Sequence, residues 1–192
     1  MDYFIIDKDW DETRNSPWDT IWHEELPHNA LGCLYGSMPL AAIWRSPPVR
    51  LERRTKRPDV YGFVLHYAVT EAAGDLFSSI AKHEAEYLPV EVPDLGLLYV
   101  IHPLWPIDFD DRAKYSCNSV SRNITDVQKY SFTIDPDRYE GPRHLFRMRQ
   151  AKGSAARDGG YSYSTIVVSE AIRQASEKAK LRGIVFRYIC SA

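Results

Sequence analysis

Short apolar runs separated by Gly, Pro and polar residues recur along this chain and predict a protein rich in β-strands. The run Tyr61–Val69 is rich in aromatic and β-branched side chains and predicts one strand. Pro89 within a later run indicates an edge strand or a bulge, because proline cannot donate a backbone hydrogen bond. The predicted strands are Tyr3–Ile6, Leu40–Trp44, Tyr61–Val69, Tyr87–Val92, Leu97–His102, Tyr130–Ile134, Leu145–Met148, Ser164–Val168 and Ile184–Ile189.

One segment between these runs shows the three- and four-residue spacing of an amphipathic helix. Thr70 is a residue type that caps helix N-termini, and the charge of Glu71 suits the first turn of a helix. The predicted apolar face of this helix holds Ala72, Ala73, Leu76, Phe77 and Ile80.

A second amphipathic helix is predicted near the end of the chain. Ser169 is its expected N-cap, Glu170 lies in its first turn, and Gly183 is expected to end it as a C-cap. Its predicted buried stripe holds Ile172, Ala175, Ala179 and Leu181.

The two helices begin in the same way. The first unit consists of a strand, a helix and a second strand, and the sequence Val-Thr-Glu at Val69–Glu71 joins its first strand to its helix. The second unit has Val-Ser-Glu at the same place, at Val168–Glu170. The similarity fits a diverged internal duplication. It fits equally well the view that any capped strand–helix–strand unit has this pattern.

These elements predict an α+β fold with a mixed or antiparallel sheet and two amphipathic helices in strand–helix–strand units. The length of 192 residues fits a single domain, 1–192. Residues 1–58 are predicted to be a loop-rich N-terminal segment, because Pro17, Pro27 and Gly36 interrupt it without a clear period, and residues 59–192 the α+β core.

Composition and charge narrow the class of protein only a little. The net charge is −2, but residues 1–30 carry a local charge of −6 and residues 45–57 one of +5. No apolar run approaches the roughly 18 residues of a membrane span, and the N-terminus lacks the pattern of a signal peptide. Three distant cysteines, Cys33, Cys117 and Cys190, suggest reduced thiols, so a cytoplasmic location is expected.

No familiar catalytic, metal or phosphate-binding motif is present, so the chain is not expected to be an enzyme or to bind a cofactor or metal. The basic stretch 143–157 has no nucleic-acid-binding module beside it and is expected to be a solvated strand-and-loop edge. An enzyme that reverses a toxin's modification stays an alternative, with Cys117, His102 and Asp108 as the residues to test.

Tryptophans beside acidic residues make a protein-binding surface the leading candidate site. Aromatic anchors near charge are typical of interfaces, and an acidic surface would steer a basic partner. The alternative is that these tryptophans fill the core beneath long loops. The predicted interface residues are Trp10, Asp11, Glu12, Trp18, Trp22, Trp105, Asp108, Asp110 and Asp111.

Several short pieces of the chain match the motifs of one known family in order: Tyr87–Val92, Leu98–Ile101 with Ile107, Asp108 and Asp110, Phe132–Asp135, Leu145–Arg147, Ile166–Glu170 and Leu181–Phe186. On these pieces the chain resembles, over roughly residues 60–190, immunity proteins of bacterial polymorphic-toxin systems, a former domain of unknown function named immunity family eleven. The resemblance departs from the family pattern at Phe109, where a cysteine is usual, and the first 55 residues match none of it.

This resemblance implies a cytoplasmic protein that binds and neutralises a cognate protein toxin, with no catalytic residues. Because the chain has no nucleic-acid-binding module and no membrane-length apolar run, neither nucleic acid nor a membrane is expected as a partner. Residues 59–192 would then be an immunity-like core. An adaptor protein of a secretion system stays a further alternative.

Overall fold

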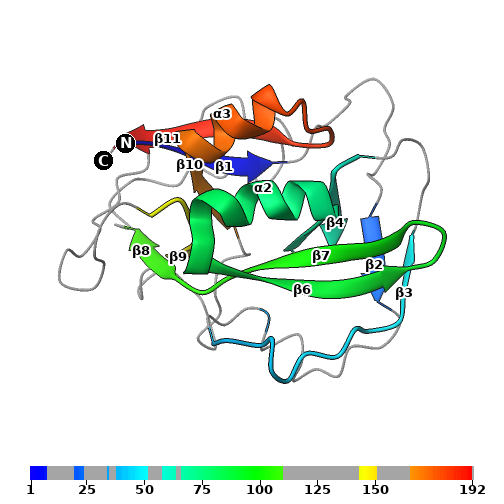
Figure 1. The fold of residues 1–192 in the computed structure, drawn as a ribbon. Helices are drawn as coiled ribbons and strands as arrows, with labels where there is room; N and C mark the ends of the chain where they lie inside the picture. The colour runs from blue at the N-terminus through cyan, green and yellow to red at the C-terminus, as the bar shows by residue number, and fades with distance from the viewer. Residues whose placement is uncertain are drawn as a thin grey trace, which may run out of the picture.

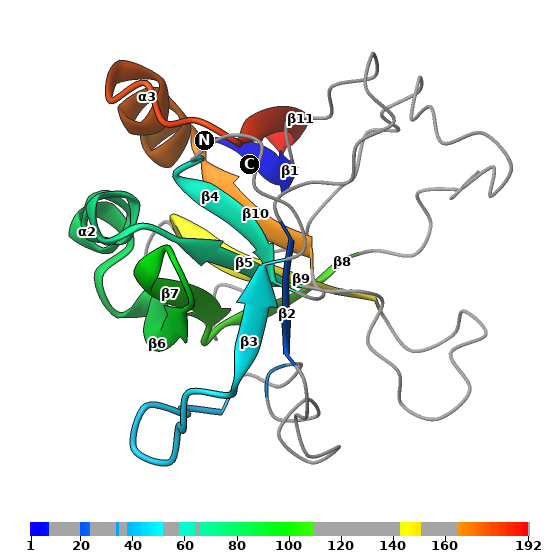
Figure 2. The ribbon, with the colours of Figure 1, turned by 90° about the vertical axis from the view of Figure 1, so that its right-hand side faces the viewer.

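The computed structural model describes residues 1–7, 20–23, 34, 38–51, 58–63, 66–109, 143–150 and 165–191. In these residues the chain has the predicted α+β fold, with two sheets and two α-helices on the same side of the molecule (Figures 1 and 2). The helices are α2 (Glu71–Ala81), followed by a 3₁₀ turn at Lys82–Glu84, and α3 (Glu170–Lys178).

The strands within the described residues form one five-stranded and one six-stranded sheet. The order of the five-stranded sheet is β11-β1-β10-β9-β8, with β11 (Val185–Ser191), β1 (Asp2–Asp7), β10 (Thr165–Ser169), β9 (Leu145–Gln150) and β8 (Pro106–Phe109). The order of the six-stranded sheet is β3-β2-β4-β5-β7-β6, with β3 (Val49–Leu51), β2 (Thr20–His23), β4 (Val60–Phe63), β5 (His66–Val69), β7 (Gly96–Pro103) and β6 (Ala85–Val92).

The two sheets repeat one topology. In the first unit (β2, β4, β5, α2, β6 and β7), β7 lies between β5 and β6 and is antiparallel to both. In the second unit (β8, β9, β10, α3, β11 and β1), β1 lies between β10 and β11 in the same way. The next pairs, β4–β5 and β9–β10, are both antiparallel, and the outer pairs, β2–β4 and β8–β9, are both parallel.

The residue register repeats as well. Val69 pairs with Val60, and Val168 pairs with Leu145 at the corresponding place. Immediately beyond these pairs the backbone N–H of Thr70 donates to the carbonyl of Asp59, and that of Ser169 donates to His144, both at 2.9 Å. The agreement of strand order, direction and register favours an internal duplication over a chance similarity of two capped helices.

The middle strand of the second unit is supplied by the N-terminus. Its counterpart in the first unit, β7, directly follows β6 along the chain, whereas β1 precedes all the other strands that the structure describes. Residues 1–58, predicted to be loop-rich, therefore contribute a central strand to the five-stranded sheet and β2 and β3 to the six-stranded one.

One buried apolar cluster lies between the helices and both sheets, so the two units share a core. A second cluster covers the other face of the six-stranded sheet, where Leu88, Val90 and Val92 alternate with exposed residues. Among the described helices, none is long and apolar enough to cross a membrane. The shared cluster comprises Phe4, Ile6, Val60, Val69, Ala73, Phe77, Ala81, Ala85, Ile101, Leu145, Ile166, Val168 and Ile172.

The predicted single strand Tyr61–Val69 is wrong. It is a hairpin in which Val60 pairs with Val69 and Phe63 pairs with His66. Both arms are apolar and rich in β-formers, so the residue pattern carried no sign of a turn between them. The predicted strand Tyr130–Ile134 lies outside the described residues.

Two other local predictions are corrected. Leu40–Trp44 is a turn, because the N–H groups of Ile43 and Trp44 both donate to the carbonyl of Leu40. Gly183 is not the C-cap of α3, since the helix ends at Lys178 and Lys180 adopts a left-handed φ of 55°.

The packed faces of the helices differ slightly from the predicted ones. Ala72 and Ala179 are exposed. Ser176, which was not predicted to be buried, is 1% exposed. Thr70 and Ser169 occupy the predicted N-cap positions, but neither hydroxyl makes a capping hydrogen bond.

Gly183 is required where the loop after α3 meets β4. Its φ is +80°, and a Cβ there would lie 2.5 Å from Pro58 Cβ and 2.7 Å from the Val60 carbonyl. We expect Gly183→Ala to cost about 1–2 kcal/mol of backbone strain plus about 1–3 kcal/mol of overpacking. Gly96→Ala is the matched control, because its φ is +89° with nothing within 4 Å. Urea unfolding that shows equal losses for the two variants would contradict this account.

Candidate functional site

The structure describes the side chain of one predicted interface residue, Trp105. The backbones of Trp22 and Asp108 lie on β2 and β8, and nothing further is described of their side chains. Outside the described residues lie Trp10, Asp11, Glu12, Trp18, Asp110 and Asp111.

Trp22 and Asp108 hold corresponding positions in the two units. Thr20 of β2 pairs with Gly62 of β4, and Pro106 of β8 pairs with Arg147 of β9 at the matching register. The two segments predicted to bind a partner therefore run through equivalent outer strands. The topology relates them, although they are far apart in the sequence.

Trp105 is half-buried, and its indole ring and its backbone carbonyl make contacts with β9 and the segment that leads into it. The guanidinium carbon of Arg143 lies 4.3 Å from the centre of the indole ring, a cation–π contact. The Trp105 carbonyl accepts a hydrogen bond from the backbone N–H of Arg147 at 2.9 Å, which fixes the residue against β9. We call Trp105 and Arg143 together the Trp105 platform.

Glu84 supports this platform from the end of α2. Its Oε2 accepts hydrogen bonds from the backbone N–H groups of His144 and Leu145, both at 2.7 Å, and its Oε1 lies 3.8 Å from Arg143 Nη1. Its own carbonyl accepts a hydrogen bond from the N–H of Leu104 at 2.9 Å. One residue thus positions both segments that meet at the platform.

The first unit uses a backbone carbonyl where the second unit uses Glu84. The N–H groups of Asp59 and Val60, which correspond to those of His144 and Leu145, donate to the carbonyl of Arg182. Sequence reasoning missed Glu84 because its role follows from this pairing between units, and no local motif marks it.

Three cationic or titratable side chains are buried where the two sheets meet. His66 on β5, His102 on β7 and Arg147 on β9 are each at most 2% exposed. Burial, then the charge of Arg147 and then His102, lowers the pKa of His66 to about 3. Burial is also the largest cause that lowers the pKa of His102. Both imidazoles are therefore neutral at pH 7.

The buried position of Arg147 corrects the interpretation of 143–157 as a solvated basic edge. Arg147 lies two residues after the buried Leu145 on the same strand, so it faces the interior. Arg143 is also mostly covered, with 15% of its side chain exposed. The remaining basic residues of this stretch have no described side chains.

The described residues form no catalytic arrangement that would support the enzyme alternative. The Nε2 of His102 donates to the Met38 carbonyl at 2.9 Å, deep in the molecule. Cys117 lies outside the described residues, and the side chain of Asp108 is not described. Among the described residues, no three His, Cys, Asp or Glu side chains are close enough to hold a metal ion.

Replacing Glu84 tests its role as the acceptor for two strand N–H groups. We expect Glu84→Ala to lower the free energy of unfolding by about 2–4 kcal/mol, because two buried donors lose a charged acceptor. Glu84→Gln keeps one oxygen and should lose clearly less. Chemical denaturation measures both variants, and equal stability of Glu84→Ala and the unmodified chain would contradict the assignment.

The buried histidines predict a pH dependence of stability. Because the folded pKa of His66 is about 3 and its ordinary value is 6.5, only the unfolded chain binds a proton between these values. The contribution of His66 is therefore complete above pH 6.5 and is lost as the pH falls toward 3, by at most about 1.4 kcal/mol per pH unit. Urea unfolding between pH 7.5 and 4.5 measures this slope.

His66→Gln should flatten the slope, whereas His83→Gln, at an exposed position, should leave it unchanged. The assignment would be wrong if His66→Gln kept the full slope.

No protein-family model matches the chain, and no match is found among curated proteins. The function is therefore argued from the residues and their geometry.

Proposed function

We propose that this chain is a cytoplasmic immunity protein that binds a cognate bacterial toxin and neutralises it by stoichiometric occlusion. The ordered motifs that resemble immunity proteins support this proposal, as does the α+β fold that carries them. The single structural observation that carries it is the Trp105 platform.

The platform has the chemistry of an interface anchor. Tryptophan and arginine are the residues that most often contribute strongly to protein–protein binding. Here the arginine is stacked on the indole at 4.3 Å and the indole is fixed to β9 through its own backbone. Because the side chains are already ordered, less conformational entropy is lost on binding a partner.

The surroundings of the platform suit a basic partner surface. Trp105 begins the segment that continues through Asp108, Asp110 and Asp111, and the corresponding outer strand of the first unit follows the acidic N-terminal segment. Acidic residues around an aromatic anchor raise the rate of association with a positively charged toxin. We propose the nine residues named above, together with Arg143, as the toxin interface.

Substitution of Trp105 tests the proposal in a complex with the protein encoded by the neighbouring toxin-like gene. We expect Trp105→Ala to weaken the complex about 30-fold or more, since an anchor of this kind contributes about 2 kcal/mol or more. Trp105→Phe, which keeps a ring beneath Arg143, should retain more of the affinity. Isothermal titration calorimetry gives the dissociation constants and the stoichiometry.

Ile43→Ala is the control, because this side chain is apolar and 67% exposed and belongs to the turn after Leu40, a different segment from those that form the platform. Absence of any complex between the purified proteins would overturn the proposed function. A complex that withstands Trp105→Ala, with circular dichroism showing an intact fold, would overturn the site.

A further inference from the structure

An open groove lies between α3 and the edge strand β11, at the opposite end of the five-stranded sheet from β8. It encloses about 400 Å³, within the range of roughly 300–1,000 Å³ that small-ligand pockets occupy. All of its lining residues belong to the second unit, and its apolar part is formed by Phe4, Leu181, Ile184, Val185, Phe186 and Tyr188.

The two units differ at a helix position that borders the groove. Counted from the N-caps Thr70 and Ser169, Phe77 of α2 corresponds to Ser176 of α3. Phe77 is completely buried in the shared core, whereas Ser176, itself only 1% exposed, has a small side chain that borders the groove. The second unit therefore lacks an aromatic side chain that the first unit supplies itself.

The edge strands β6 and β11 also differ between the two units, because only β6 is covered by another segment of the described chain. On β6, the indole N–H of Trp44 donates to the Pro89 carbonyl at 2.7 Å and the N–H of Glu91 donates to Ser46 Oγ at 3.3 Å, so the chain covers this edge itself. By register, Tyr188 of β11 corresponds to Pro89, because Phe4 and Tyr99 hold matching places on the middle strands. Tyr188 is 44% exposed and lines the groove.

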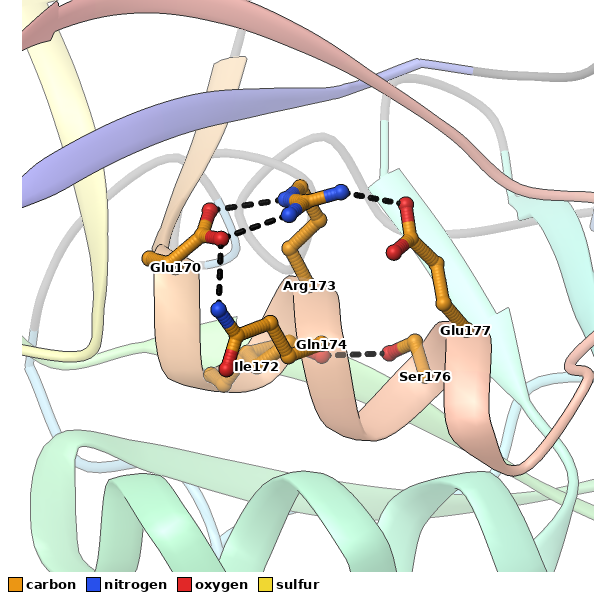
Figure 3. Close-up of polar contacts among 6 residues, drawn as sticks. All are labelled: Glu170, Ile172, Arg173, Gln174, Ser176 and Glu177. Atoms are coloured by element: carbon orange, nitrogen blue, oxygen red, sulfur yellow. Dashed lines mark hydrogen bonds and ion pairs between the residues drawn. The ribbon is translucent and has the colours of Figure 1, made fainter.

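The polar side chains that α3 contributes to the groove already have partners within the helix (Figure 3). The Ser176 hydroxyl donates to the Ile172 carbonyl at 2.8 Å, within the helix. Arg173 lies 5.1 Å from the centre of the Phe4 ring and is bound by Glu170 on one side and Glu177 on the other. Its charge is balanced by two carboxylates, which leaves apolar contact as the main attraction of the groove.

Leu181, which lines the groove, is flanked in the sequence by basic residues. Lys178, Lys180 and Arg182 are all exposed. Arg182 lies 3.6 Å from Asp59, but no described carboxylate forms an ion pair with Lys178 or Lys180. This excess of positive charge favours an acidic segment and disfavours a second copy, which would bring lysines against lysines.

We infer that the α3–β11 groove docks a partner protein through one aromatic side chain flanked by acidic residues. The aromatic ring would take the space that Phe77 fills in the first unit, and the acids would face Lys178 and Lys180. This surface is separate from the Trp105 platform, so the inference does not depend on the proposed function.

The test uses the full chain and a defined probe, an acetylated and amidated pentapeptide with one phenylalanine between two pairs of aspartates. Titration followed by ¹⁵N amide shifts should move the signals of Ser176, Leu181 and Phe186. Replacing the four aspartates by lysines, or the phenylalanine by serine, should weaken binding at least tenfold.

Two pairs of variants locate the site. Ser176→Phe should weaken the peptide at least tenfold by filling the groove, while Ser79→Phe on exposed α2 surface should have no effect. Lys180→Glu should weaken it about threefold, whereas Lys82→Glu, at another residue with positive φ, should not. Because Lys180 is exposed, Lys180→Glu is expected to leave the fold intact. The Lys180 and Lys82 variants therefore still test the location of the binding site if Ser176→Phe unfolds the chain.

Equal binding of the acidic and basic peptides, shifts confined to other surfaces, or no response to both Ser176→Phe and Lys180→Glu would overturn the inference. A dimer in sedimentation analysis that Ser176→Phe dissociates would assign the groove to a second copy and also overturn it. A toxin complex unaffected by these variants leaves the proposed function standing.

Discussion

The carboxylate of Glu84 joins the two units of this molecule. Glu84 is the last residue of the 3₁₀ turn after α2 in the first unit. Its carboxylate accepts hydrogen bonds from the backbone N–H groups of His144 and Leu145, where β9 begins in the second unit. A hydrogen bond to a charged acceptor contributes about 1.5–3 kcal/mol, and a buried donor without a partner costs a similar amount. The start of β9 sets the register in which Arg147 enters the interior and Arg143 reaches Trp105.

The differences between the units are more informative than their common topology. Where the first unit has Gly62, the second has the buried Arg147, and where the first has Phe77, the second has Ser176. The first exchange places a charge at the junction of the sheets, and the second leaves a groove at the far edge. The Trp105 platform and the α3–β11 groove both adjoin strands of the second unit, at the two ends of the five-stranded sheet.

The sequence predicted the positions of the strands and helices better than it predicted which strands pair with one another. Period-two and period-3.6 patterns depend on burial of one face, so the expected bounds of β6, β7, β10 and α2 lie close to the observed ones, as does the start of α3. The hairpin at Val60–Val69 was missed because both arms are apolar. The interior position of Arg147 and the role of Glu84 depend on strand pairing across many residues, which no local pattern encodes. Of the predicted interface, only the side chain of Trp105 could be compared with the structure.

The N-terminal origin of β1 has a consequence for the order of events during synthesis. All strands of the first unit lie within residues 20–103, so that unit can close soon after β7 leaves the ribosome. The five-stranded sheet has β1 between β10 and β11 and must wait for a strand made about 180 residues later. Until then β1 has two open edges, and open edges invite pairing with other chains. Pairing of β10 and β11 with β1 therefore comes late in assembly and closes both of these edges.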